Sequence, residues 1–178
     1  MKFGGYTSIT AQCNITSETC DMQGQGKYGT YTIAREFDER GEIDRWMQLF
    51  LRTDGQNLAL AEGLLREERF YIGLREIPLS LLEGIKSGAP EYLHDQDSID
   101  YFFDVVDRMK QAHDSWDIPP LIVEYGEKGF YVADGRHRLE MYRQIGSTHV
   151  PAALWTTGGQ RRDELLEMLI AQSKRTDQ

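Results

Sequence analysis

The chain has 178 residues, 40% of them hydrophobic and 28% charged, and its 20 Lys and Arg against 29 Asp and Glu give a net charge of −9. This length and composition fit one globular domain, or one domain with an extension, and the acidic balance argues against a globally basic nucleic-acid coat protein. Two cysteines, Cys13 and Cys20, are too few for a disulfide scaffold or a four-cysteine zinc site, and no run approaches the roughly 18 apolar residues that would span a membrane. Since the chain begins without an apolar signal segment, we expect a cytoplasmic protein with no membrane contact.

Residues 1–69 are expected to form an N-terminal extension or a small subdomain. Residues 1–27, rich in Ser, Thr, Gln and Gly, predict an irregular lead-in, and the alternation of aromatic and β-branched residues over 28–37 predicts a strand. Apolar residues in 42–51 recur at helical spacing, which favours a helix, although the preceding turn residues leave a hairpin strand open. A loop over 53–57 and a short helix over 58–68 complete this part.

Residues 70–178 predict a compact α/β (α+β) unit, because strands and helices follow each other in a regular order. The predicted strands are 70–77, 121–125, 130–133 and 149–155. The predicted helices are 98–112, 135–145 and 161–172, with a short helix or turn over 78–85. Apolar residues of 98–112 repeat on one face with aspartates opposite, which is typical of a helix on a hydrophobic core.

The segment Asp134-Gly135-Arg136-His137-Arg138 joins a predicted strand to a predicted helix. Asp134 is suited to cap the helix, and Gly135 permits a tight turn. The next three residues then fall in the first helical turn, where free amides and the positive end of the helix dipole attract anions. Because arginine at this position is unfavourable for the helix itself, the pattern indicates a phosphate-binding site.

Four motifs in order resemble those of the ParB/sulfiredoxin superfamily. They are Ile77-Pro78-Leu79-Ser80, Ile118-Pro119-Pro120, Gly135-Arg136-His137-Arg138 and Val150-Pro151-Ala152-Ala153. The resemblance covers about residues 70–172 and implies a mixed sheet with helices that binds nucleotide phosphates. Arg136 occupies the position of the sulfiredoxin catalytic cysteine, so peroxiredoxin repair is not expected. No helix-turn-helix follows the core, so a complete partition protein is not expected either.

What remains resembles the small stand-alone branch of that superfamily, which includes nucleotide hydrolases, nucleases and plasmid fertility-inhibition factors of the oncogenic suppression type. The resemblance implies an ATP hydrolase with DNase activity as a further expectation, using ATP and Mg²⁺. Arg136 and Arg138 would clamp the phosphates, with Gly135 and Ser80 beside them, and His137 would act as acid or base. Asp134 and Glu76 are the expected catalytic carboxylates and metal ligands.

Two other functions stay open from the sequence. The chain could be a non-catalytic module whose affinity for DNA or a protein is gated by a bound nucleotide. It could also be an interaction protein that contacts its target through residues 1–69. A local arginine patch, such as Arg161-Arg162 or the pair Lys174-Arg175, is the expected contact if DNA is a partner, although such pairs are more often solvated helix ends.

Overall fold

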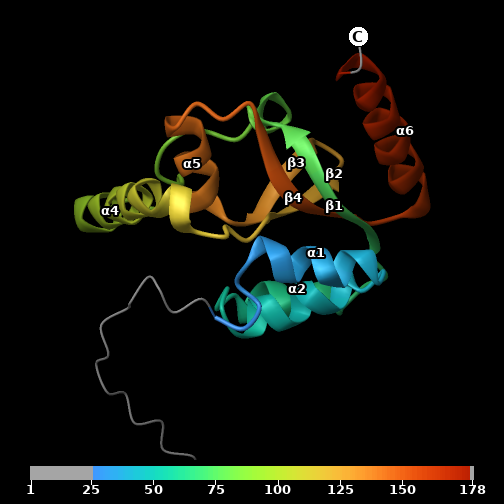
Figure 1. Cartoon of the computed structure of the whole chain (residues 1–178), viewed down its shortest axis with the longest axis horizontal. Helices are drawn as coiled ribbons and strands as arrows, with labels where there is room; N and C mark the ends of the chain where they lie inside the picture. Colours follow the sequence, from blue (N-terminus) through green and yellow to red (C-terminus); the bar gives the residue numbers. More distant parts are fainter. Residues whose placement is uncertain (1–25, 177–178) are drawn as a thin grey trace, which may run out of the picture.

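The computed structural model describes residues 26–176, in which helices cover both faces of one mixed four-stranded sheet (Figure 1). The strands are β1 (Phe70–Pro78), β2 (Leu121–Gly126), β3 (Gly129–Asp134) and β4 (His149–Thr156). The helices are α1 (Tyr31–Glu39), α2 (Ile43–Arg52), α3 (Leu58–Leu64), α4 (Gln96–Ala112), α5 (Arg136–Gln144) and α6 (Gly159–Thr176). Short 3₁₀ helices η1 (Leu79–Leu82) and η2 (His113–Ser115) lie in the connections. The predicted α+β class is therefore confirmed.

The strand order is β1-β4-β2-β3, which places β1 and β3 at the two edges of the sheet. β1 pairs antiparallel with β4, and β2 pairs antiparallel with β3 through the tight turn between Gly126 and Gly129. β2 and β4 run parallel, so the chain needs a crossover between them, and this crossover contains β3 and α5. The connection sets the start of α5 directly after the edge strand β3.

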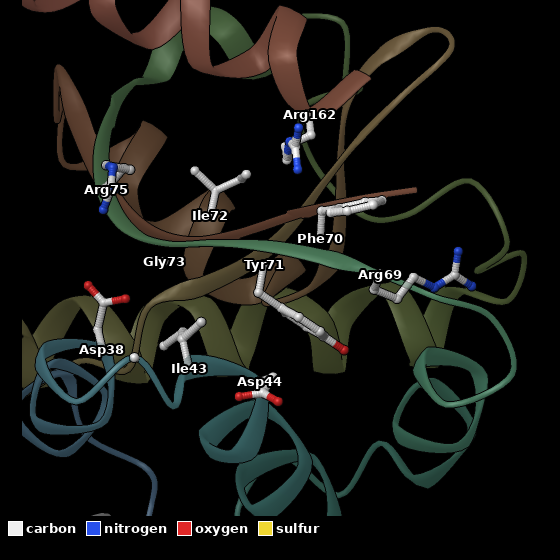
Figure 2. Close-up of a pocket in the computed structure, with 11 residues that line it drawn as sticks. Asp38, Ile43, Asp44, Arg69, Phe70, Tyr71, Ile72, Gly73, Arg75 and Arg162 are labelled. Atoms are coloured by element: carbon white, nitrogen blue, oxygen red, sulfur yellow. The ribbon is translucent and has the colours of Figure 1, made fainter. Parts of the chain in front are cut away.

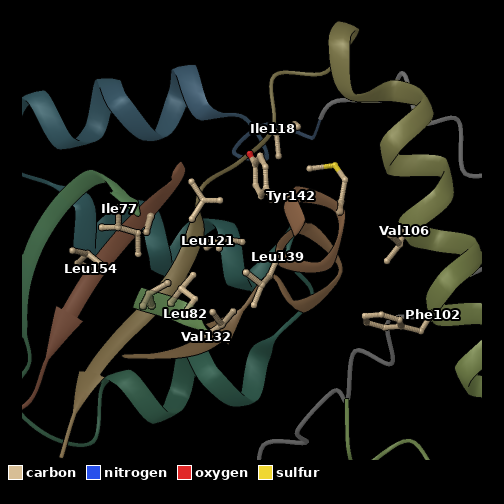
Figure 3. Close-up of a cluster of buried hydrophobic side chains, with 14 residues drawn as sticks. Ile77, Leu82, Phe102, Val106, Ile118, Leu121, Val132, Leu139, Tyr142 and Leu154 are labelled. Atoms are coloured by element: carbon tan, nitrogen blue, oxygen red, sulfur yellow. The ribbon is translucent and has the colours of Figure 1, made fainter. Parts of the chain in front are cut away.

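Each face of the sheet has its own hydrophobic core. On one face, Leu121 and Val123 pack with Leu139 of α5 and with Phe102 and Val106 of α4 (Figure 3). On the other face, sheet residues and α1–α3 residues form a second buried cluster. That second cluster includes Trp46, Met47 and Phe50 from α2, with Ile122, Ala153 and Trp155 from the sheet. The helices before residue 70 therefore cover one sheet face and share its core.

The strand predicted over 28–37 is wrong, because this segment forms α1. The Thr30 hydroxyl accepts a hydrogen bond from the Ile33 amide at 3.2 Å and caps the helix. Ala34 is fully buried, and Ile33 and Phe37 pack on the same cluster, at helical spacing. The aromatic and β-branched residues suggested a strand locally, but the face they bury has the period of a helix.

The other predicted elements of the described part are confirmed, with shifted ends. Residues 42–51 form α2, so the hairpin alternative for them is wrong. α3 ends at Leu64, earlier than expected, and α4 begins at Gln96 after its cap, Asp95. No helix among the described residues is long and apolar enough to cross a membrane. The predicted irregular lead-in lies almost entirely outside the described residues, as do Cys13 and Cys20.

Candidate functional site

The start of α5 is built on a glycine. Gly135 is the N-cap residue with φ of 106°, in the left-handed region, and it contributes no side-chain cap. A Cβ at this position would lie 2.8 Å from Leu121 Cδ2 and 2.9 Å from an Arg138 guanidinium nitrogen. Both the backbone conformation and the close packing therefore require glycine here. The uncapped first turn leaves the amides and the positive dipole end of α5 as an anion-binding feature.

Arg138 is a structural residue in this fold. Its side chain is only 6% exposed. Its guanidinium donates to the Pro119 and Pro120 carbonyls at 2.8 and 2.7 Å and to Asp134 Oδ2 at 2.6 Å. Burial lowers the pKa of Arg138, and the adjacent Asp134 carboxylate opposes that effect. These contacts engage both terminal nitrogens of the guanidinium inside the protein, which does not fit the phosphate clamp expected from the sequence.

Asp134 also has a role other than the one expected. Its carboxylate does not cap α5. It accepts hydrogen bonds from Arg138 and, at 3.1 Å, from Asn57 Nδ2, the side chain at the start of α3. Asp134 thereby joins the N-terminal helices, the end of β3 and the first turn of α5. The Asp134–Arg138 pair fixes the position of the α5 start relative to both cores.

Arg136 points instead toward a groove beside the edge strand β3. Its guanidinium donates to the Lys86 carbonyl at 3.2 Å. The groove has a volume of about 860 Å³. Its charged lining residues are Lys86, Lys128, Arg136 and Arg161, with Glu91, Glu124 and Glu127. Exposed ion pairs engage part of this set, with Arg161 and Glu127 at 2.6 Å and Lys86 and Glu91 at 3.8 Å. Arg136, in the first turn of α5, and Lys86, whose carbonyl it contacts, are thus two cations of this groove beside the uncapped helix start.

His137 borders a second, more apolar cavity. Its ring stacks on Phe102, with centroids 4.4 Å apart and planes inclined by 28°. This cavity, of about 380 Å³, is also lined by Tyr92, Leu93 and Tyr101. Burial, followed by the positive charge of Arg138, lowers the pKa of His137. The imidazole is therefore neutral at neutral pH, and it is available as a hydrogen-bond partner or proton acceptor.

The segment between η1 and α4 lies over the start of α5 and links the two cavities. Glu140 of α5 accepts hydrogen bonds from the Gly88 amide at 2.8 Å and the Ser87 hydroxyl at 3.2 Å. Arg143 donates to the Leu82 and Ile85 carbonyls at 2.8 and 2.7 Å. These anchors hold Tyr92, which lines both cavities and is 72% exposed.

Glu76 lies apart from the start of α5. Glu76 is on the edge strand β1, whereas Asp134 ends β3 at the opposite edge, with β4 and β2 between them. At a strand spacing of roughly 4.8 Å their backbones are at least about 14 Å apart, so the two carboxylates do not share a metal ion. Burial raises the pKa of Glu76. Ser80 is exposed in η1. Among residues 26–176, no group of three or more His, Cys, Asp or Glu side chains could hold a metal ion.

Sequence reasoning missed most lining residues of the two cavities, among them Lys86, Tyr92, Tyr101 and Glu124. Lys86 and Tyr92 are in an irregular segment whose course depends on the Glu140 and Arg143 anchors, and no local pattern predicts that. Glu124 on β2 is half-buried in the groove beside β3, and burial raises its pKa.

No protein-family model matches this chain, and no curated protein matches it. The resemblance to the ParB/sulfiredoxin superfamily therefore stays a prediction that rests on the four motifs. The geometry of the α5 start has to support any functional proposal by itself.

Proposed function

We propose that this chain binds a nucleoside triphosphate at the start of α5. The observation that carries the proposal is the position of this uncapped helix start between a charged groove and an aromatic cavity. A nucleoside triphosphate combines a polyanion with a flat ring system. The ligand would therefore match both cavities at once, with its phosphates at the helix start and its base among the aromatic side chains.

The phosphates would accept hydrogen bonds from the first-turn amides of α5, and from Arg136 and Lys86 beside them. Arg136 would exchange its bond to the Lys86 carbonyl for phosphate oxygens. Charge supports this placement, because a cationic pair at a helix N-terminus is unfavourable unless an anion is present. The net charge of −9 makes nonspecific attraction of polyanions weak, so local geometry has to supply the affinity.

The base would enter the cavity bordered by His137, Tyr92 and Tyr101. Tyr101 is 64% exposed, and a stacked base would cover part of this apolar surface. Base–aromatic stacking contributes about 1–3 kcal/mol per base. ATP should consequently bind more tightly than inorganic tripolyphosphate, which has the same anionic chain but no base.

Hydrolysis of the bound nucleotide is a second candidate, and the state of His137 favours it. The neutral His137 imidazole lies in the proposed base cavity, one residue after Arg136, so it would accept a proton from a water that attacks from the side of that cavity. The separated positions of Glu76 and Asp134 do not fit the expected two-carboxylate metal site. A divalent cation would have to be held mainly by the phosphates themselves. The alternative of binding without turnover therefore stays open beside hydrolysis.

DNase activity, a role in plasmid fertility inhibition and contact with DNA stay predictions from the resemblance. The Arg161-Arg162 pair is already engaged with carboxylates, since Arg161 meets Glu127 at 2.6 Å and Arg162 meets Asp163 at 2.8 Å. The side chains of Lys174 and Arg175 lie outside the described part.

Calorimetric titration with ATP and with tripolyphosphate tests the binding proposal. Wild type should bind both and prefer ATP. Arg136→Ala should weaken both by about tenfold, as loss of a charged hydrogen bond predicts. Tyr101→Ala, which lines the base cavity and not the charged groove, should weaken ATP alone, and Arg108→Ala on α4 serves as the control. Equal affinities for ATP and tripolyphosphate would contradict the proposed base pocket. No binding of either ligand to folded wild type would refute the proposal.

Release of phosphate from ATP with Mg²⁺ separates the two candidates. Turnover that is lost in His137→Phe, while ATP binding survives, would establish hydrolysis. Binding without turnover would select the gated module. Arg138→Ala is unsuitable here, because loss of this buried side chain would disturb the fold together with the site.

A further inference from the structure

A second groove follows the other edge of the sheet, along β1. It has a volume of about 670 Å³ and lies between α6 on one side and the α1–α2 pair on the other (Figure 2). β1 pairs only with β4 within the sheet of the described residues, so its second backbone edge faces this groove. An edge strand with room beside it is a template for an additional strand.

Two arginines and two aspartates line opposite sides of this groove, and Arg69, which also lines it, is paired with Glu67 and Thr157. Figure 2 shows Arg75 and Arg162 on the α6 side of β1, and Asp38 and Asp44 on the α1–α2 side. Ile72 on the first side and Ile43 on the second lie between the charges. The Arg162 guanidinium lies over the Phe70 ring, 5.2 Å from its centroid, and pairs with the neighbouring Asp163 at 2.8 Å, an exposed contact that a bound carboxylate would replace.

The register of β1 explains this separation. Side chains alternate between the two faces of a strand, and the irregularity between Tyr71 and Gly73 shifts that alternation by one residue. Ile72 packs toward the core under α4 and α5, whereas Tyr71 and Leu74 pack toward the core of α1–α3. Arg75, the neighbour of Leu74, therefore shares the Ile72 side.

A strand added beside β1 would present alternate side chains to the two sides of the groove. Acidic residues would face Arg75 and Arg162, and basic residues would face Asp38 and Asp44. A second copy of the chain fits poorly in antiparallel pairing, because the two-fold axis would place each arginine side next to itself. We propose that the β1 edge binds an extended protein segment in which acidic and basic residues alternate, with small apolar residues between them.

Side chains cover part of the free edge of β1, and a bound segment would displace them. The Arg75 guanidinium donates to the Leu74 carbonyl at 2.5 Å, and Asp38 lies against Gly73, so both side chains cover part of β1. A bound strand would supply its own amides and leave Arg75 free to meet an acidic side chain. This groove is at the opposite sheet edge from β3, so it can be tested independently of the proposed nucleotide site.

The test uses the full chain and two synthetic peptides of identical composition, titrated by fluorescence anisotropy. In the first, Glu and Lys alternate around a central Ile. In the second, the same residues form one acidic and one basic block. The alternating peptide should bind about fivefold more tightly, which corresponds to about 1 kcal/mol from partly exposed charge pairs, and the difference should shrink with added salt. Equal affinities, or no binding at about 1 mM peptide, would overturn the proposal.

A double variant, Arg75→Glu with Arg162→Glu, makes both sides of the groove acidic. An all-Lys peptide, added as a third ligand, should bind wild type less tightly than the alternating peptide, and the double variant should reverse this order. The matched control, Arg108→Glu with Lys110→Glu on α4, has the same net charge and should keep the wild-type order. Circular dichroism of the double variant has to show a folded protein, because an unfolded acidic chain would also attract an all-Lys peptide. An unchanged order would refute the proposal, as would a concentration-dependent dimer that the double variant dissociates.

Discussion

The buried Arg138 side chain allows a quantitative prediction of the change in the free energy of unfolding. Replacement by Met keeps much of the buried volume but removes the donors to Pro119, Pro120 and Asp134. Removal of one partner of a buried ion pair typically costs about 3–5 kcal/mol, because the remaining charge stays desolvated. Most domains have a free energy of unfolding of about 5–15 kcal/mol, so Arg138→Met should remove a large part of it.

Urea unfolding followed by tryptophan fluorescence measures this loss. With an m-value of about 2 kcal/mol/M, a loss of about 4 kcal/mol moves the midpoint by roughly 2 M. Arg136→Met, in the same helical turn but at the groove, should change stability by no more than about 0.5 kcal/mol. The double variant Arg138→Met with Asp134→Asn should cost less than the sum of the single variants, because the two side chains interact directly. If Arg138→Met stays within about 1 kcal/mol of wild type, the structural role of the pair is refuted.

Two further predictions concern the same helix start. Gly135→Ala should lower the free energy of unfolding by about 2–3 kcal/mol, because it combines left-handed strain with a close contact. The control Gly129→Ala, with φ of 94° and no atom within 4 Å of the new Cβ, should lower it by only about 1 kcal/mol. Equal losses in urea titrations would contradict the packing argument. Because the pKa of His137 is lower in the folded state, the unfolded chain takes up this proton at a higher pH. His137 therefore lowers the free energy of unfolding as the pH falls below its unfolded pKa of about 6.5. His137→Phe should keep the stack on Phe102 and lose this part of the pH dependence, whereas the control His94→Phe should keep the wild-type pH dependence. If the free energy of unfolding of His137→Phe changes with pH as in wild type, another group is responsible.

Much of the fold could be predicted because local patterns and tertiary packing agree. The strands β1 to β4 and the helices α4 to α6 follow from hydrophobic period and from turn residues such as Gly126 and Gly129. The failure over 28–37 has a physical reason. Its aromatic and β-branched residues prefer strands locally, but the Thr30 cap and the α1–α3 core impose a helix.

The candidate site was only partly predictable from the sequence. The α5 start was located by its glycine and its basic turn, and the structure confirms both the glycine conformation and the helix. The sequence could not distinguish Arg136 from Arg138, because their difference depends on the Pro119 and Pro120 carbonyls, which approach from a distant loop. A shared site for Glu76 and Asp134 could not be judged from the sequence either, since strand order separates Glu76 on β1 from Asp134 at the end of β3.

The most direct test of the nucleotide site is an amide chemical-shift map of the full chain during titration with ATP. The proposal predicts that the largest changes occur at the amides of Arg136 and His137 and along the segment that contains Lys86 and Tyr92, with little change along β1. Saturable changes confined to another surface, or no changes in a folded sample, would contradict the account.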